Sequence, residues 1–229
     1  MARLKIAVLI SGRGSNLQAL IGACSAADAP AEIVLVLSNE PAAAGLQRAA
    51  AAGLPTRVVP HREFTDRAAF DAALDRHLRE AEVELICLAG FMRLLTDAFV
   101  ERWRDRMINI HPSLLPAFPG LNTHARALEA GVRFTGCTVH FVRTEMDTGP
   151  IIVQAAVPVH PEDDADSLAA RVLEAEHQAY PLALRLIAEG RVGVVGGRTV
   201  ISDAAAPSEA LLNPVALPAD AAPDPSCRN

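Results

Sequence analysis

The sequence lacks any stretch apolar enough to cross a membrane and any run of basic residues. Its first apolar run, residues 5–10, is far shorter than the roughly 20 residues that a membrane span needs, and no small-residue cleavage site follows it. Lys and Arg number 21 against 27 Asp and Glu, a net charge of −6, which disfavours binding to a phosphate backbone. We therefore expect a cytoplasmic protein with no signal peptide, no membrane anchor and no nucleic-acid partner.

Cysteine and histidine are scarce and are not grouped. The four cysteines, Cys24, Cys87, Cys137 and Cys227, show no CxxC spacing, and the seven histidines form no HxxxH or HExxH pair. These spacings argue against a disulfide framework and predict no metal site. They also fit a reducing compartment.

Apolar residues make up 51% of the 229 residues, which is enough for a large core and excludes wholesale disorder. From residue 202 onward Ala, Pro and Asp dominate without any periodic pattern. We expect residues 1–201 to form a single domain and the Ala/Pro-rich residues 202–229 to form a disordered tail.

Apolar runs of strand length alternate with stretches of helical period, which is typical of βαβ units. The predicted strands are 5–10, 32–37, 57–59, 84–89, 107–110, 138–142 and 151–159. The predicted helices begin near Ser15 and cover 42–52, 68–81 and 165–188, with a kink at Pro181 and then a hairpin over 192–201 that turns at Gly196-Gly197. The pattern predicts an α/β fold with a Rossmann-like open, mostly parallel twisted sheet and helices on both faces.

A glycine-rich segment, Ser11-Gly12-Arg13-Gly14-Ser15-Asn16, separates the first predicted strand from the first helix. Glycine lets the backbone approach a ligand, and the free N–H groups of a helix start favour an anion such as a phosphate. The dinucleotide fingerprint is incomplete, because Leu17 stands where its third glycine would be. The segment is either a phosphate loop or a purely structural turn.

A polar pair lies at the end of the strand predicted over 107–110. Asn109 and His111 are two residues apart and project to one face, while Ile108 and Ile110 face apolar packing. An Asn amide can donate to a developing oxyanion and a His can supply a proton or a positive charge, so the pair suits acyl chemistry. The alternative is that both side chains only cap the strand.

Two carboxylates and one further histidine are candidates for the same site. Asp147, in the turn MDTGP, would orient and charge a histidine if it lay beside one, and otherwise only starts the turn. Glu176 borders the apolar stripe of the last helix, where it is either a solvated rim residue or an enclosed partner for an amine. His140 either lines a cleft or is an ordinary buried histidine.

Several motifs together resemble the phosphoribosylglycinamide formyltransferase family. They are ISGRGSNLQAL (10–20), AGFMRLL (89–95), INIHPSLLPAFPG (108–120), GCTVHFV (136–142), MDTGP (146–150) and EHQAYP (176–181). The resemblance covers about residues 4–200. HPSLLP and the later Asp-x-Gly-Pro are shared with other enzymes that use formyltetrahydrofolate, whereas Gly-Ser-Asn is typical of the glycinamide ribonucleotide branch.

The resemblance implies transfer of a formyl group from the co-substrate 10-formyltetrahydrofolate to the amine of glycinamide ribonucleotide, in purine biosynthesis. It implies a catalytic trio of Asn109, His111 and Asp147. It implies ribonucleotide contacts at Gly14, Ser15, Asn16 and Glu176, the last near the glycinamide amine. Folate contacts are implied at Arg67, Met92, Arg93, Leu94, Leu95, Asn109, Thr144 and Asp147, with no metal and with a monomer or homodimer as the assembly.

Two positions depart from the family pattern, and three other functions compete. Asn122 stands where the family often has histidine, and Ala117 where it often has lysine. Methionyl-tRNA formyltransferase would need a further nucleic-acid-binding domain, and formyltetrahydrofolate deformylase would carry an extra regulatory domain. A non-enzymatic nucleotide or folate sensor is the third alternative.

Overall fold

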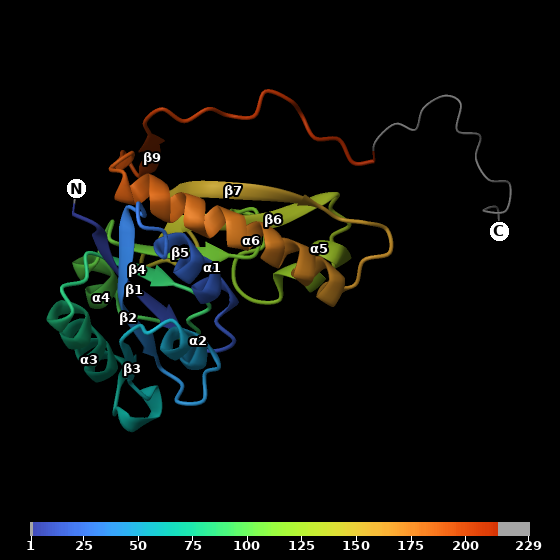
Figure 1. Ribbon diagram of the computed structural model, residues 1–229. Helices are drawn as coiled ribbons and strands as arrows, with labels where there is room; N and C mark the ends of the chain where they lie inside the picture. The colour runs from blue at the N-terminus through green and yellow to red at the C-terminus, as the bar shows by residue number, and fades with distance from the viewer. Residues whose placement is uncertain (1, 215–229) are drawn as a thin grey trace, which may run out of the picture.

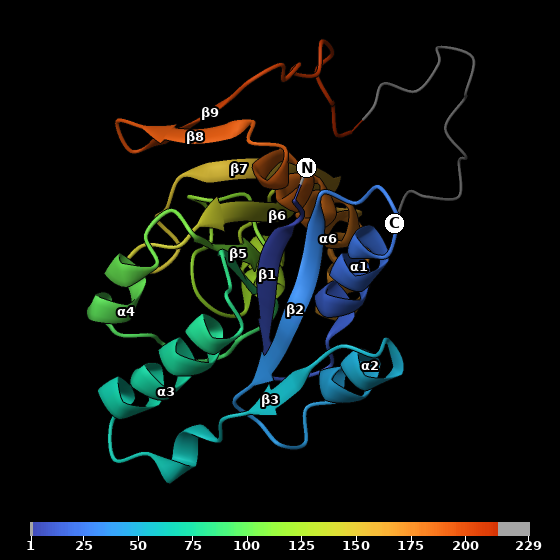
Figure 2. The same ribbon diagram turned by 60° about the vertical axis from the view of Figure 1, so that its left-hand side comes forward.

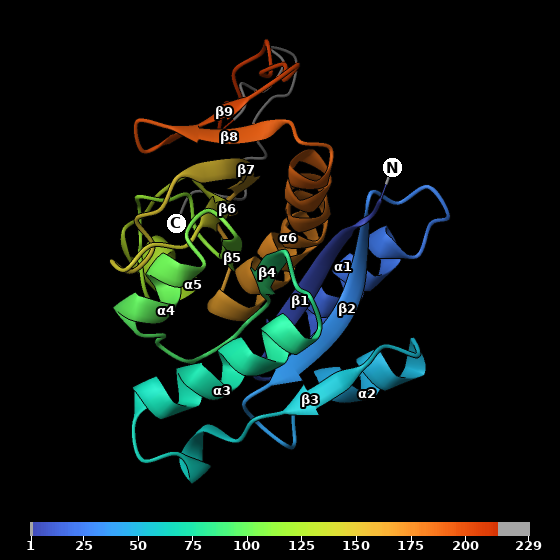
Figure 3. The same ribbon diagram turned by 90° about the vertical axis from the view of Figure 1, so that its left-hand side faces the viewer.

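The computed structural model describes residues 2–214, which fold around a seven-stranded sheet (Figure 1). The strands are β1 (Leu4–Ile10), β2 (Ala31–Ser38), β3 (Thr56–Val58), β4 (Leu85–Leu88), β5 (Met107–His111), β6 (Phe134–Phe141) and β7 (Ile151–Pro158). The helices are α1 (Ser15–Cys24), α2 (Gly45–Ala51), α3 (Arg67–Glu80), α4 (Asp97–Arg102), α5 (Thr123–Glu129) and α6 (Ala165–Ala188), with a 3-10 turn η1 (His61–Glu63). A separate hairpin of β8 (Val192–Val195) and β9 (Arg198–Ile201) follows α6 and lies beside β7 (Figure 3).

The strand order is β3-β2-β1-β4-β5-β6-β7, and the pairs from β3 to β5 are parallel. The antiparallel β6 separates β5 from β7. The expected open, mostly parallel α/β sheet is therefore confirmed. Because the chain builds outward from β1 to β3 and then returns to add β4 on the other side, the crevice between β1 and β4 is a topological switch point, where ligands bind in such sheets.

Two apolar clusters fill the space between the sheet and its helices, one on each face. Residues of α1 and α6 pack with the even-numbered side chains of β1, such as Ile6 and Val8, and those of α3 and α4 pack with Ala7 and Leu9. Figure 2 shows α1 and α6 on one side of the strands and α3 and α4 on the other. The prediction of helices on both faces is thus confirmed.

The long helix α6 has the predicted bounds, and its start is explained by its cap. The side chain of Asp164 accepts the N–H groups of Asp166 and Ser167, and the Ser167 hydroxyl accepts the N–H of Asp164 in return. The helix runs on through Pro181, and a kink there stays a prediction. The hairpin at Gly196-Gly197 is confirmed.

Other boundaries differ from the sequence-based expectation. The short helices α4 and α5 and the turn η1 are not among the predicted elements, since three to seven residues carry too little helical periodicity to recognise. Strand β6 starts at Phe134 rather than at Thr138, because Gly136 interrupts the apolar alternation but still pairs with Ala156.

The disordered tail over residues 202–229 stays a prediction. Residues 202–214 contain no helix or strand, yet the Asn213 side chain donates hydrogen bonds to the carbonyl oxygens of Arg133 and Val159 at 2.6 and 3.0 Å. Residues 215–229 lie outside the described residues.

Candidate active site

The carboxyl ends of β1, β4 and β5 lie side by side and carry most of the candidate residues. Leu88 pairs in register with Leu9 on one side and with Asn109 on the other, so the loops that follow the three strands leave the sheet together. Ser11 begins the first loop, Ala89 begins the second, and Pro112 begins the third. The glycine-rich segment, the AGFMRLL motif and the HPSLLP motif are therefore neighbours in space.

Asn109 and His111 point to the face of the sheet that α3 and α4 cover. Met107, two residues before Asn109, belongs to the apolar cluster on that face, while Ile108 and Ile110 belong to the cluster under α1 and α6. The predicted division of β5 into a polar and an apolar face is confirmed. His111 is buried, and Asn109 is half-buried.

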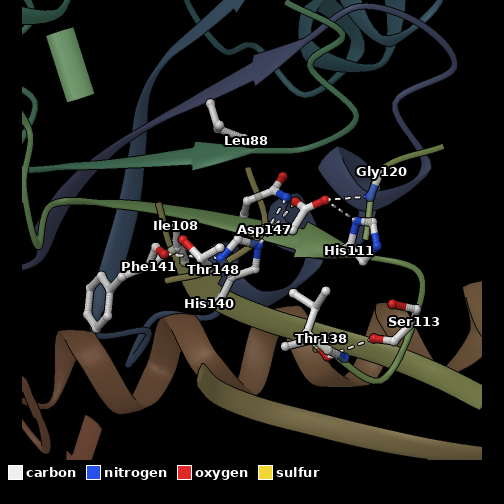
Figure 4. Close-up of polar contacts among 12 residues, drawn as sticks. Leu88, Ile108, His111, Ser113, Gly120, Thr138, His140, Phe141, Asp147 and Thr148 are labelled. Atoms are coloured by element: carbon white, nitrogen blue, oxygen red, sulfur yellow. Dashed lines mark hydrogen bonds and ion pairs between the residues drawn. The ribbon is translucent and has the colours of Figure 1, made fainter. Parts of the chain in front are cut away.

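Asp147 reaches His111 because the loop of residues 142–150 doubles back over the sheet. The loop leaves β6 at Phe141, which pairs with Ile108 near the start of β5, yet Asp147 contacts the far end of that strand. Its Oδ2 lies 3.5 Å from Nδ1 of His111 and accepts the backbone N–H of Gly120 at 2.8 Å (Figure 4). The structure thus brings together three residues that are 38 positions apart in the chain at most.

His140 completes this cluster from the neighbouring strand, opposite Asn109 in the β5–β6 register. Its Nδ1 lies 3.0 Å from the carbonyl of Phe141, which can only accept, so Nδ1 carries a hydrogen. Burial lowers the pKa of His140 and favours the neutral ring, whose bare Nε2 then accepts from Asn109 Nδ2 at 3.3 Å. This contact orients the Asn109 amide and leaves its second N–H available for a ligand.

The loop of residues 112–122 supplies the second partner of His111. His111 Nε2 donates to the carbonyl of Phe118 at 3.0 Å, and the buried Ser113 hydroxyl donates to the carbonyl of Ala117 at 2.6 Å. Thr138 ties the loop to β6 by accepting from Leu115 N–H and donating to the carbonyl of Ser113. Nε2 of His111 therefore carries a hydrogen toward the loop, and Nδ1 faces the carboxylate of Asp147.

The two departures from the family pattern, Ala117 and Asn122, both fall in this loop. Ala117 is exposed and contributes its carbonyl to Ser113, so a longer side chain is not needed for that contact. Asn122 is the residue before α5 and adopts the left-handed conformation, with φ of 56°, which asparagine tolerates better than most residues.

The glycine-rich loop has the geometry of an anion cradle at the start of the ten-residue helix α1. Gly14 precedes the helix with φ of 72°, and a Cβ there would meet Gly45 Cα at 2.6 Å. Gly45 N–H in turn donates to the carbonyl of Gly12 at 3.0 Å, and Arg48 Nε donates to the carbonyl of Arg13 at 3.0 Å. Residues of helix α2 therefore hold the glycine-rich loop through the carbonyl groups of the loop, and the N–H groups at the start of α1 stay available for a ligand.

Asn16 and Glu176 form a buried pair between α1 and α6. Asn16 Nδ2 donates to Glu176 Oε2 at 2.7 Å, and Asn16 Oδ1 is buried with no partner among the described residues. Burial raises the pKa of Glu176, and the bond from Asn16 opposes this only in part. Glu176 is thus an enclosed carboxylate and not a solvated rim residue. The carboxylate of Glu176 and Oδ1 of Asn16 can both accept hydrogen bonds from a ligand.

The expected folate residues are mostly accessible. The second loop exposes Met92 and Leu94 and partly buries Arg93 and Leu95. Two large apolar side chains left exposed in one loop, at the switch point of the sheet, are typical of a ligand-binding surface. Arg67 is exposed at the start of α3, and Thr144 is exposed in the loop of residues 142–150.

The sequence-based reasoning left His140 undecided and did not single out Ser11 or Asn39. The sequence signal for His140 is its alternating position in the strand predicted over 138–142, which could turn it toward a cleft. Ser11 and Asn39 both follow strand ends, which is the position where functional side chains gather in parallel sheets.

Over residues 2–214, no group of three or more His, Cys, Asp or Glu side chains is placed to hold a metal ion. None of the helices in that range is long and apolar enough to span a bilayer.

The sequence matches the family model described as formyl transferase over residues 4–184. It is 56% identical over 192 residues to the trifunctional purine biosynthetic protein adenosine-3 of Gallus gallus, covering 84% of this chain but 19% of that protein. It is 44% identical over 209 residues to the phosphoribosylglycinamide formyltransferase of Haemophilus influenzae, covering 91% of this chain and 99% of that one. The glycinamide ribonucleotide transformylase 1 of Symbiobacterium toebii superposes with a TM-score of 0.85 at 47% identity, covering 87% and 94% of the two chains.

Proposed function

The chain belongs to the formyl transferase family, and we propose that it transfers the formyl group of 10-formyltetrahydrofolate to the amine of glycinamide ribonucleotide, a step of purine biosynthesis. We propose further that it acts in the cytoplasm, as a monomer or homodimer. The observation that carries the proposal is the contact of His111 with Asp147 beside Asn109, next to an anion cradle at the same sheet edge.

The ribonucleotide half of the site is built on α1 and α6. Gly14, Ser15 and Asn16 begin α1, where N–H groups and the helix dipole favour the ribonucleotide phosphate. Glu176 and the unpartnered Oδ1 of Asn16 offer acceptors to the hydroxyl and amine hydrogens of the same molecule. In a chain with a net charge of −6, such a local device is needed to hold an anion.

The folate half of the site is built on the loops after β4 and β6. The exposed side chains of Met92 and Leu94 offer apolar contact to a flat ring system, and Thr144 lies in the loop that also carries Asp147. The guanidinium groups of Arg67 and Arg93 suit the carboxylates of the folate tail.

In the reaction, the neutral amine attacks the formyl carbon, and charge collects on the formyl oxygen. The free N–H of Asn109 and the positive charge of a protonated His111 stabilise that oxygen, while Asp147 offsets the charge of the imidazolium. The new carbon–nitrogen bond forms, the bond from the formyl carbon to N10 breaks, and the amine proton moves to N10 through a water held by Asp147. The products are formylglycinamide ribonucleotide and tetrahydrofolate.

The test is to incubate the full chain with 10-formyltetrahydrofolate, with and without glycinamide ribonucleotide, and to measure loss of the formyl group. Loss that requires the ribonucleotide, with formylglycinamide ribonucleotide as product, is the expected result. Loss without the amine would identify a hydrolase, and binding without any loss would identify a sensor. Either of these two outcomes would contradict the proposal.

A further inference from the structure

Ser11 connects the loops that follow β1, β2 and β4. Its backbone N–H donates to the carbonyl of Gly90 at 3.2 Å, and its hydroxyl oxygen accepts the N–H of Met92 at 2.8 Å. The same hydroxyl donates to Oδ1 of Asn39 at 2.5 Å. One side chain therefore holds the start of the glycine-rich loop against the loop that carries the expected folate residues.

The direction of these bonds is fixed by Asn39. This residue is 2% exposed, and its Oδ1 faces the Ser11 hydroxyl while its Nδ2 lies 3.1 Å from Nδ1 of His61. Oδ1 can only accept, so the single hydroxyl hydrogen of Ser11 must point to Asn39. The lone pairs of Ser11 are then left to accept the N–H of Met92, which makes the arrangement specific to a hydroxyl.

We propose that Ser11 is a positioning residue that sets the two substrates at reacting distance. The inference rests on the proposed function, because it takes one loop to bind the ribonucleotide and the other to bind the formyl donor. Reaction between two bound molecules needs the attacking nitrogen and the formyl carbon aligned at about 3 Å, and a displacement of about 1 Å can cost on the order of 100-fold in rate. A bond that joins the two loops directly controls this alignment.

The variant Ser11→Ala removes both side-chain bonds and keeps the backbone bond to Gly90. The N–H of Met92 is in an exposed contact and can donate to water instead. Oδ1 of the buried Asn39, in contrast, loses its hydrogen-bond donor. Each loop keeps its own ligand-binding groups. We therefore expect each substrate alone to bind nearly normally and the reaction between them to slow.

The experiment compares Ser11→Ala with Ser25→Ala in the full chain. Ser25 is a matched control, since its hydroxyl also makes a partly buried bond, to the carbonyl of Ile21 at 2.6 Å, but at the far end of α1. In Ser11→Ala we expect kcat to fall about tenfold or more, with the Kd of the ribonucleotide alone changed less than about threefold. We also expect faster hydrogen exchange at the Met92 amide.

A kcat for Ser11→Ala within about twofold of the Ser25→Ala value, at a temperature where both are folded, would overturn the inference. A merely structural role would lower the melting temperature and leave kcat unchanged. If Ser11→Ala does not fold, Ser11→Cys keeps the volume with a weaker hydrogen-bonding group and is held to the same comparison. Absence of transfer by the unsubstituted protein would instead contradict the proposed function.

Discussion

Replacing Asp147 with asparagine isolates the charge that faces His111. Asp147 has φ of 57°, a conformation that asparagine also adopts, and an amide oxygen can still accept the N–H of Gly120. The shape of the loop should therefore survive. The same oxygen position faces Nδ1 of His111, and the amide nitrogen would take the place of Oδ1, which lies 3.9 Å from Nε2 of His140. Nδ1 of His111 would then face a neutral amide oxygen in place of a carboxylate.

The size of the effect follows from the distance and the burial. Two unit charges at the 3.5 Å between Asp147 Oδ2 and His111 Nδ1 interact by roughly 5 kcal/mol at an effective dielectric constant of about 20. The neutral amide oxygen that replaces Oδ2 and residual solvent offset part of this, and we take about 3 kcal/mol as the loss in transition-state stabilisation. This corresponds to roughly a 100-fold fall in kcat.

The assay measures kcat with both substrates saturating and, separately, the Kd of the ribonucleotide, which should change little. Asp105→Asn is the matched control, because Asp105 also has a left-handed backbone, with φ of 58°, and also pairs with a cation, Arg143 at 2.5 Å. A kcat for Asp147→Asn within about fivefold of that control would refute the electrostatic role of Asp147.

Three further predictions concern the surroundings of the site. Burial raises the pKa of Glu176, so its contribution to stability is present at low pH and is lost as the pH rises through the folded-state pKa. Glu176→Gln should therefore raise the melting temperature more at pH 8 than at pH 5, and it should also weaken ribonucleotide binding. Gly45→Ala should lower the melting temperature and raise the ribonucleotide Kd, because the alanine Cβ would lie 2.6 Å from Cδ1 of Ile10 and 3.1 Å from Cα of Gly14. An unchanged Kd would mean that the glycine-rich loop has room to move. Burial lowers the pKa of His140, so this residue lowers the stability of the fold as the pH falls through its unfolded-state pKa. His140→Gln should therefore lose less melting temperature between pH 7 and pH 5 than the unsubstituted protein does. Equal losses in the two proteins would contradict this.

The fold could be predicted because its strongest signals are local. The apolar runs that became β1 and β2 and the long amphipathic α6 are each readable from one stretch of sequence. The antiparallel direction of β6 could not be read in this way, because it depends on which edge of the sheet is free after β5 has been placed. The short α4 and α5 were missed because tertiary contacts, more than helical periodicity, hold elements of this length.

The site could be predicted only where its parts adjoin in sequence. The alternation of Asn109 and His111 with two isoleucines gave their common face, and the run Gly14-Ser15-Asn16 gave the loop. The contact of Asp147 with His111 could not be derived from spacing. The loop that carries Asp147 leaves β6 beside the start of β5 and then returns to the end of β5, where His111 lies. Its inclusion in the trio came from family resemblance alone, and the 3.5 Å contact now gives that inclusion a geometric basis.

The two halves of the proposed site lie on opposite faces of one sheet, and this explains why the proposed reaction must take place at the edge of the sheet. Asn16 and Glu176 belong to the layer of α1 and α6, whereas Asn109 and His111 point toward the layer of α3 and α4. Strands packed on both faces leave no route between these layers through the sheet. A molecule that contacts both layers can do so only beyond the carboxyl ends of β1, β4 and β5. Under the proposed function, the positions of the loops there relative to one another therefore decide whether two bound substrates meet.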